Sequence, residues 1–328
     1  MTTIVTVASG KGGVGKSVTV SNLGLALAAR GRKVVVADLD LGGSNLATLF
    51  GAFEEGPDLG SFLSRDVSSL ADVMRPLRRD LWLIAGAGET LATANPNWGM
   101  KQRLLRQLRK LPADVVLVDV GAGAGAHALD FFNAGDLRIV VTVPEPTASV
   151  DAYRFIKLAT VREAVTRVSS RDPGRRVLER RDFHRASELW TTLGAEPGDE
   201  AATPRAAAPW VVVNQATDAR RHFERLQIVT RRFLARELRL LGEIPRDPAV
   251  AEAVGAFLPV VESQPSSPAA RAFVELARRV DDELIRHGIA RRDGPVESPL
   301  PRVAASASTR PELPAGRRAA FPPPPSAG

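Results

Sequence analysis

The chain has 328 residues, of which 44% are apolar and 25% are charged, so most of it can form a packed core and low-complexity disorder is excluded. At ~150 residues per domain, this length predicts about two domains or one large α/β domain. The longest stretch without a charged residue has 13 residues, whereas a membrane-spanning helix needs about 20, and we see no basic leader followed by an apolar segment that would predict a signal peptide.

Cysteine is absent and histidine occurs only four times. The missing thiols exclude disulfides, thiolate zinc sites, cysteine-ligated iron–sulfur clusters and thiol nucleophiles. The formal net charge is +7, and two interpretations of it stay open. The charge reflects either an arginine-rich composition, as in many high-GC genomes, or a polyanionic partner such as nucleic acid, acidic lipid or nucleotide phosphate.

Residues 1–165 alternate short apolar runs with longer helical patterns. The runs are nearly continuous in apolar residues, which favours strands that helices cover on both faces. They are Ile4–Ala8, Val34–Ala37, Leu81–Ala85, Val115–Val118 and Ile139–Val143. Helical patterns lie between them, for example at Ser17–Arg30 and Met100–Lys110. This order predicts an α/β fold with a doubly wound, mostly parallel sheet.

The alternation breaks at about Thr166. Residues 166–209 contain eight Arg and seven Asp or Glu, and they end in the Gly/Ala/Pro-rich stretch Gly194–Pro209. We therefore expect a partly helical insertion at 166–208 with a flexible return. Strands at Trp210–Val213 and Leu240–Ile244 then continue the sheet.

Helices are predicted at about Ala216–Arg239, Pro248–Gly255 and Ala269–His287. Nine prolines fall within the last 35 residues of the chain, a composition that cannot bury enough apolar surface to fold. The sequence thus predicts one α/β domain made of residues 1–165 and 209–288, followed by a proline-rich disordered tail at 289–328.

A glycine-rich segment, Gly10-Lys-Gly-Gly-Val-Gly-Lys16-Ser17, directly follows the first predicted strand and precedes a helix. It satisfies G-x-x-x-x-G-K-[ST], the phosphate loop of P-loop nucleotide triphosphatases, in the context that this motif requires. The glycines allow backbone N–H groups to surround phosphate oxygens, and the helix adds its positive end. Lys16 should neutralise the β- and γ-phosphates, and the Ser17 hydroxyl should bind Mg²⁺. The predicted nucleotide-binding residues of this segment are Gly10, Lys11, Gly12, Gly13, Val14, Gly15, Lys16, Ser17 and Val18.

A second lysine, Lys11, stands one residue after the first glycine, and it cannot easily share one phosphate cradle with Lys16. The segment from Lys11 to Ser17 resembles the deviant Walker A loop of the MinD/ParA (SIMIBI-class) ATPases. The resemblance implies that Lys11 reaches across a nucleotide-sandwich dimer to the phosphates of the partner subunit. An arginine finger given in trans is the physical analogue.

Asp38-Leu-Asp40, after the second predicted strand, resembles the switch I segment of that family. The resemblance assigns Asp40 to orienting the attacking water and Asp38 to the Mg²⁺ surroundings or to the switch itself. It also places Asn45 in the dimer contact. The alternative is that these charges simply end a strand.

Asp119, at the end of the fourth apolar run, resembles the Walker B carboxylate, which would hold Mg²⁺ through water. Gly121-Ala-Gly123 would then be switch II, close to the γ-phosphate. The longer segment Gly121–Ala126 also fits the looser dinucleotide fingerprint G-x-G-x-x-G/A. A NAD or FAD site is therefore an alternative, although a phosphate site already follows the first strand.

The later part of the chain resembles the base-binding side of the same family. Asn214 resembles the asparagine that reads adenine, and the stretch that contains Pro245, Arg246 and Asp247 resembles the one that completes the base pocket. The segment Pro144–Tyr153 is similar to the FlhG/YlxH flagellar-number regulators of the MinD branch. The likeness covers about residues 3–165 and 209–288.

These resemblances imply a Mg²⁺-dependent ATPase, with Lys11, Lys16 and Asp40 as catalytic residues, that forms a homodimer with ATP and positions cellular machinery of the flagellar or division-site type. An activating protein would stimulate it, in the cytoplasm or at the inner face of the plasma membrane, where an anionic membrane surface is a further candidate partner. The alternative is a ParA-type partition ATPase that binds DNA without sequence preference through the arginine-rich helix after Asn214. A third class is metabolic ligases of the cobyrinic acid synthase or dethiobiotin synthetase type, which would need a glutaminase cysteine or a defined substrate pocket; the absence of cysteine counts against the first type.

Overall fold

The computed structural model describes residues 2–41, 43–87, 95–169, 172–192 and 208–286. The predicted tail at 289–328 and nearly all of the predicted return at Gly194–Pro209 lie outside the described residues. Within the described ranges, no helix is both long enough and apolar enough to span a membrane.

Eight strands of the described chain form one sheet, in the order β3-β4-β2-β5-β1-β6-β7-β8. Neighbouring strands run parallel, except that β3 is antiparallel to β4. The predicted doubly wound, mostly parallel sheet is therefore confirmed. The strands are β1 (Thr3–Ala8), β2 (Val34–Leu39), β3 (Arg75–Arg78), β4 (Leu81–Ile84), β5 (Val115–Val120), β6 (Leu137–Thr142), β7 (Trp210–Ala216) and β8 (Arg239–Pro245).

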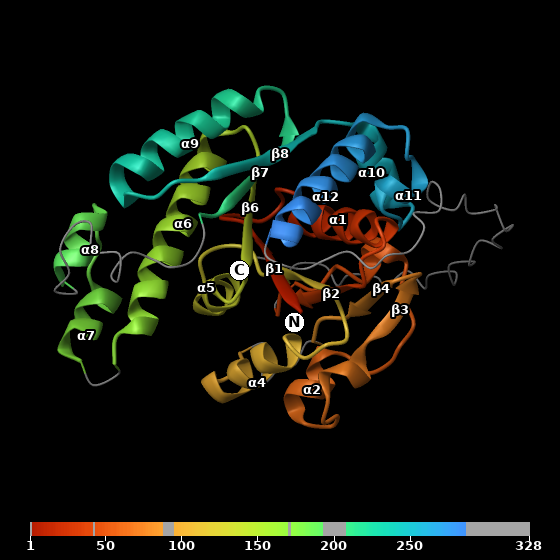
Figure 1. The fold of residues 1–328 in the computed structure, drawn as a ribbon, viewed down its shortest axis with the longest axis horizontal. Helices are drawn as coiled ribbons and strands as arrows, with labels where there is room; N and C mark the ends of the chain where they lie inside the picture. Colours follow the sequence, from red (N-terminus) through yellow and green to blue (C-terminus); the bar gives the residue numbers. More distant parts are fainter. Residues whose placement is uncertain (1, 42, 88–94, 170–171, 193–207, 287–328) are drawn as a thin grey trace, which may run out of the picture. The chain divides into compact units, whose positions relative to one another are not determined.

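Helices cover both faces of this sheet (Figure 1). In the described residues they are α1 (Lys16–Ala29), α2 (Leu59–Ser64), α4 (Trp98–Leu108), α5 (Ala126–Asn133), α6 (Pro146–Arg167), α7 (Pro173–Arg180), α8 (Ala186–Thr192), α9 (Ala219–Leu234), α10 (Pro248–Gly255), α11 (Val260–Ser263) and α12 (Pro268–Arg286), with short 3₁₀ turns η1 (Thr48–Phe50) and η2 (Leu70–Val73). One group consists of α1, α10, α11 and α12, and the other group includes α2, α4, α5, α6 and α9.

Alternate residues of the central strands point to these two layers. Val36 and Leu117 lie against α1 at Gly24, whereas Val35 and Val116 belong to the core on the opposite face. Every residue of β1, β2, β5 and β6 is buried. Because both faces of these strands are covered, their sequences are nearly continuous apolar runs rather than an alternation of apolar and polar residues.

Two elements differ from the predictions. The edge strand β3 contains a proline and two arginines, so its sequence carries no apolar run. The helix predicted from Ala216 to Arg239 is shorter, because the Asp218 side chain accepts a hydrogen bond from the N–H of Arg221 and caps the start of α9. Its last turn ends at Ala235, whose positive φ of 49° takes the chain out of the helix.

The chain leaves the sheet along α6, which continues to Arg167, one residue beyond the predicted break. Helices α7 and α8 pack against the far end of α6 around a small apolar core. This core consists of Ala164, Val165, Leu178, Phe183 and Leu189. The insertion predicted at 166–208 stays a prediction, because the residues after Thr192 are outside the described ranges until residue 208.

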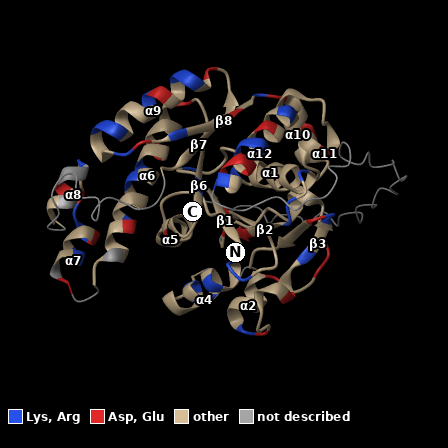
Figure 2. Cartoon of the chain, in the orientation of Figure 1, with Lys and Arg blue, Asp and Glu red and all other residues tan. Residues whose placement is uncertain are grey.

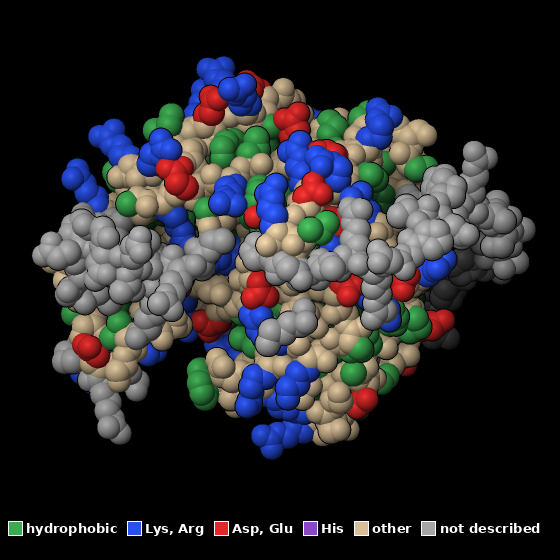
Figure 3. All heavy atoms as spheres, viewed as in Figure 1, with side chains coloured by type: hydrophobic (Ala, Val, Ile, Leu, Met, Phe, Trp, Pro, Cys, Tyr) green, Lys and Arg blue, Asp and Glu red, His purple; other side chains and the backbone are tan. Residues whose placement is uncertain are grey.

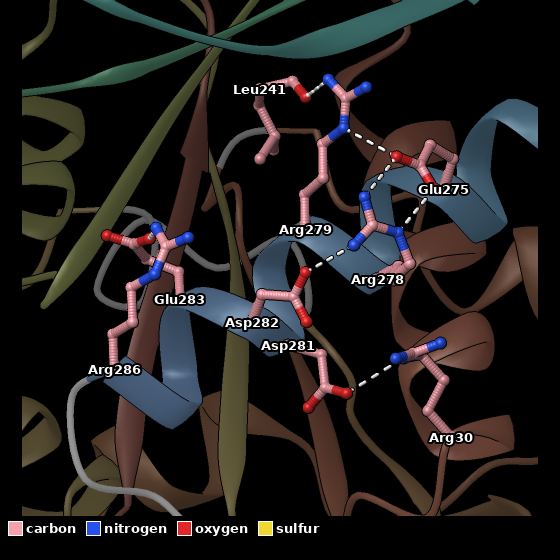
Figure 4. A network of polar contacts seen from close by, with 9 residues as sticks. All are labelled: Arg30, Leu241, Glu275, Arg278, Arg279, Asp281, Asp282, Glu283 and Arg286. Carbon is pink, nitrogen blue, oxygen red and sulfur yellow. Dashed lines mark hydrogen bonds and ion pairs between the residues drawn. The ribbon is translucent and has the colours of Figure 1, made fainter.

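A buried ion pair joins the first and last described helices. Just after the end of α1, the Arg32 Nε lies 2.7 Å from Asp281 Oδ1 of α12, and the Arg30 Nε lies 3.0 Å from Asp281 Oδ2 (Figure 4). Arg32 is 1% exposed and Asp281 is 0% exposed. Because both groups are removed from water, each depends on its partner for compensation of the lost hydration.

We expect Asp281→Ala to lower the free energy of unfolding by ~3–5 kcal/mol, because it leaves the Arg32 charge buried without its carboxylate. The neighbouring change Asp282→Ala is the matched control, since Asp282 pairs with Arg278 at the surface and such pairs contribute ~0–1 kcal/mol. Urea unfolding of both variants checks this expectation. Equal losses in the two variants would contradict it.

Candidate nucleotide-binding site

The predicted site residues gather at one edge of the sheet. Strands β1, β2, β5, β7 and β8 run parallel, so their carboxyl ends lie along the same edge, where ligands bind in open α/β sheets. The phosphate loop follows β1, the two predicted switches follow β2 and β5, and the predicted base-binding residues stand at the ends of β7 and β8.

The phosphate loop turns directly into α1. Lys16 is the first helical residue, so Ser17 and Val18 fall within the first turn, and no side chain caps its N–H groups. Gly12 and Gly13 are exposed, which leaves this part of the loop accessible to a ligand. Gly15 has a φ of 87°, and a Cβ there would lie 2.2 Å from the Asn214 amide nitrogen. Only glycine satisfies both the backbone angle and the close contact.

Lys16 lies at the centre of the polar cluster at this edge. Its side chain is almost fully buried, and its Nζ lies 2.5 Å from Asp119 Oδ1 and 3.5 Å from Asp40 Oδ2. The Ser17 hydroxyl is also 3.5 Å from this nitrogen. The structure therefore brings together four of the residues that the sequence assigned to phosphate, water and metal.

The properties of the Asp119 carboxylate fit the role of a metal ligand. Burial raises the pKa of Asp119 to about 6, although the neighbouring Lys16 lowers it. Its Oδ2 atom is buried and accepts no hydrogen bond within the described residues. A charge at this oxygen lacks compensation, so Ser17 and Asp119 fit a Mg²⁺ ion at this position.

Among the described residues, no cluster of three or more His, Cys, Asp or Glu side chains could hold a metal ion by itself. Mg²⁺ usually keeps several waters and is bound by one or two carboxylates together with substrate phosphates. Ser17 and Asp119 would supply such a partial set of protein ligands.

Asp38 organises the segment that follows β2. Its buried carboxylate accepts hydrogen bonds from the N–H groups of Asp40, Asn45 and Leu46 at 3.0–3.1 Å and from the Ser44 hydroxyl at 2.8 Å. Burial raises the pKa of Asp38, so these donors stabilise a carboxylate that is costly to desolvate. Of the two roles implied for Asp38, these contacts favour holding the switch.

The predicted switch II contacts the segment that follows β2 and the end of β1. Gly121 faces Asp40 so closely that a Cβ would be 3.2 Å from Asp40 Oδ1. The N–H of Gly123 donates a hydrogen bond to the Ser9 carbonyl at the end of β1, over 3.0 Å. These contacts link the two predicted switches to each other and to the end of β1, just before the phosphate loop.

Lys11 has a different partner from Lys16. Its Nζ lies 2.8 Å from Glu145 Oε2 and 3.4 Å from the Thr147 hydroxyl, at the start of α6. About a third of the Lys11 side chain is exposed. The sequence analysis missed Glu145, which is 134 residues from Lys11; its position just after β6, at the same edge of the sheet, is the signal that could have found it.

The predicted base-binding residues lie in or directly after β7 and β8, the neighbouring parallel strands at one end of the sheet. The Asn214 amide nitrogen donates a hydrogen bond to the Val14 carbonyl over 2.8 Å through one of its two N–H groups. Pro245 pairs in register with Ala216 of β7. The Asp247 carboxylate contacts two backbone N–H groups, of Ala249 and Ala269, rather than pointing to an open site.

Comparisons with known proteins agree with this geometry. A family model described as the CobQ/CobB/MinD/ParA nucleotide binding domain matches residues 5–260. The antiactivator FleN of Pseudomonas aeruginosa is 30% identical over 290 residues, which cover 85% of this chain and 86% of FleN. The flagellum site-determining protein YlxH of Helicobacter pylori is 35% identical over 164 residues, which cover 48% of this chain and 53% of YlxH.

A solved structure shows the same fold. It is the septum site-determining protein MinD of Pyrococcus horikoshii OT3, complexed with Mg-ADP, which superposes with a TM-score of 0.63 and 24% identity over 88% of this chain and 99% of that chain. With the family model and FleN, this likeness agrees with the resemblance seen in the phosphate loop. The chain belongs to the CobQ/CobB/MinD/ParA family of nucleotide-binding domains.

Proposed function

We propose that the chain binds and slowly hydrolyses ATP with Mg²⁺, and that ATP joins two copies into a dimer that positions flagellar or division-site machinery. One observation carries this proposal: the two lysines of one loop have separate surroundings. Lys16 is buried among Asp40 and Asp119, whereas Lys11 is partly exposed and held by Glu145. A loop that served only its own nucleotide would have no evident use for the second lysine.

The proposed chemistry assigns one task to each side chain. Lys16 exchanges its contact with Asp119 for phosphate oxygens, while Ser17 and Asp119 hold the metal. Mg²⁺ supplies charge neutralisation at the β- and γ-phosphates. Asp40, which is partly exposed beside Gly121, orients the attacking water.

Dimer formation requires Lys11 to leave Glu145. The Glu145 side chain is 59% exposed, and an ion pair of this kind contributes only ~0–1 kcal/mol. The phosphates of a second subunit offer a stronger anion, so the nucleotide favours the dimer over the separate chains. Asn45, held in place by Asp38, would contact the second subunit.

Adenine specificity follows from the orientation of Asn214. The Val14 carbonyl accepts from one of the two N–H groups of the Asn214 amide, and this bond orients the amide so that its oxygen can accept from the base. Adenine presents an amino donor where guanine presents a carbonyl acceptor. An acceptor at this position therefore favours ATP over GTP, with the backbone of Pro245, Arg246 and Asp247 completing the pocket.

The names of the relatives support a positioning role. FleN is an antiactivator and YlxH is a flagellum site-determining protein, and FleN is matched over most of its length. By analogy, a partner protein would complete the site and stimulate hydrolysis, in the cytoplasm or at the inner face of the plasma membrane.

A second candidate function is DNA binding of the ParA type, and helix α9 is the observation that favours it. Figure 2 shows Lys or Arg positions along α9. Arg221, Arg225 and Arg232 are exposed, and none forms an ion pair with an acidic side chain in the described ranges. The face drawn in Figure 3 nevertheless mixes Lys and Arg with Asp and Glu. A duplex usually meets a surface of one sign, so the dimerisation switch is the better supported function.

Substitution of the two lysines should impair different steps, ATP binding for Lys16 and dimerisation for Lys11. We expect Lys16→Ala to lose ATP binding, because the central phosphate-neutralising charge is removed. Lys11→Ala should bind ATP as the unmodified chain does and yet remain a monomer with little turnover. Titration with a fluorescent ATP analogue and sedimentation of both variants check this. If both variants lose the same property, the role of Lys11 in trans is wrong.

Asp40→Ala should bind ATP without hydrolysing it and accumulate as a dimer in sedimentation velocity, since the attacking water is no longer oriented. A monomer at saturating ATP would refute the proposal. The same runs with DNA and with anionic liposomes compare the alternative partners. For DNA, binding should weaken with a slope of about −0.9 per neutralised phosphate as salt rises.

Glu145→Gln should strengthen ATP-dependent dimerisation by up to about 30-fold, because each dimer frees two lysines from a contact worth at most ~1 kcal/mol each, or ~2 kcal/mol in total. Glu224→Gln is the matched control, since Glu224 forms an exposed pair with Arg220 on α9. The dimer dissociation constant measured by sedimentation equilibrium distinguishes the two. A weaker dimer in Glu145→Gln than in the control would contradict the competition.

A further inference from the structure

The carboxylate of Asp247 bridges the starts of two helices. Its Oδ1 accepts a hydrogen bond from the N–H of Ala249 in α10, and its Oδ2 accepts one from the N–H of Ala269 in α12, each over 3.0 Å. These hydrogen bonds, that from Ala269 above all, hold the pKa of Asp247 below its usual range. An ionised carboxylate is the favoured cap for the positive ends of both helices.

Helix α12 is a firm support for this contact. Ala269 is fully buried, and further along α12 the Arg279 Nη1 donates a hydrogen bond to the Leu241 carbonyl of β8 over 2.6 Å (Figure 4). On the side of α1, Asp281 pairs with the buried Arg32. The end of β8 is therefore attached to a helix that cannot easily shift.

The segment fixed in this way lies beside the proposed base pocket. Pro245 pairs with Ala216 of β7, two residues beyond Asn214, and Asn214 is itself tied to the phosphate loop through Val14. Neighbouring strands are about 4.8 Å apart. The backbone from Pro245 to Asp247 is thus one strand outward from the amide that faces the base.

We infer that Asp247 is a positioning residue for the base end of the nucleotide. Its side chain faces the two helix starts, and by holding them it sets the backbone that receives adenine. Base recognition then depends on the attachment of α12, whereas phosphate binding depends on the loop before α1. This inference rests on the proposed ATP-binding function.

The test compares two ligands that differ by the nucleoside. Asp247→Ala should weaken binding of Mg-ATP by about 5- to 10-fold in calorimetry and reduce the preference for ATP over GTP. Binding of Mg-tripolyphosphate, which reaches only the phosphate loop, should change less than about twofold. Asp247→Asn, which keeps one capping oxygen, should show an intermediate loss of ATP binding.

Asp172→Ala is the matched control, because Asp172 caps α7 through the N–H of Gly174 over 2.8 Å, outside the sheet; it should bind both ligands as the unmodified chain does. Unchanged ATP binding in Asp247→Ala, or an equal loss of ATP and tripolyphosphate binding, would overturn the inference. If Asp247→Ala does not fold, the same comparison on Asp247→Asn decides. Failure of the unmodified chain to bind ATP would instead refute the proposed function.

Discussion

The contact between Lys16 and Asp119 is the interaction on which the site depends. Both side chains are almost fully buried, at the end of strands that helices cover on both faces. Such a sheet leaves few places for charged side chains except near the ends of its strands. Charges therefore accumulate along one edge, where each is only partly compensated, and an anionic ligand with its cation completes the arrangement.

Helix α6 links that edge to the part of the chain with no assigned role. It begins beside Lys11, with Glu145 and Thr147 in contact with the lysine, and it ends at the small core shared with α7 and α8. Its 22 residues correspond to about 33 Å of rigid helix. A protein that binds α7 and α8 would therefore contact the same helix whose first turn holds Lys11, the residue assigned to the proposed dimer.

Most of the fold could be predicted from the sequence because continuous apolar runs identify strands buried on both faces. The edge strand β3 could not, since Arg75 and Pro76 remove the apolar signal. The site residues that the sequence placed after different strands do lie at one edge, because parallel strands end together. The sequence analysis missed contacts between distant segments, namely Ala269 with Asp247 and Glu145 with Lys11, for which the position of Glu145 after β6 gave a signal but the partner did not. No spacing within the chain encodes such contacts, and the resemblance to a family supplies only the residues of its motifs.

The ion pair between Arg32 and Asp281 has a consequence for how the chain folds during its synthesis. These residues are 249 positions apart, so the layer formed by α1 and α12 closes only when the ribosome has released nearly all of the described chain. Until then, the side of α1 that faces α12 has no cover, and contacts of such long range form slowly. Nascent chains therefore expose the side of α1 that faces α12 until α12 has been synthesised, although the phosphate loop before α1 is already present.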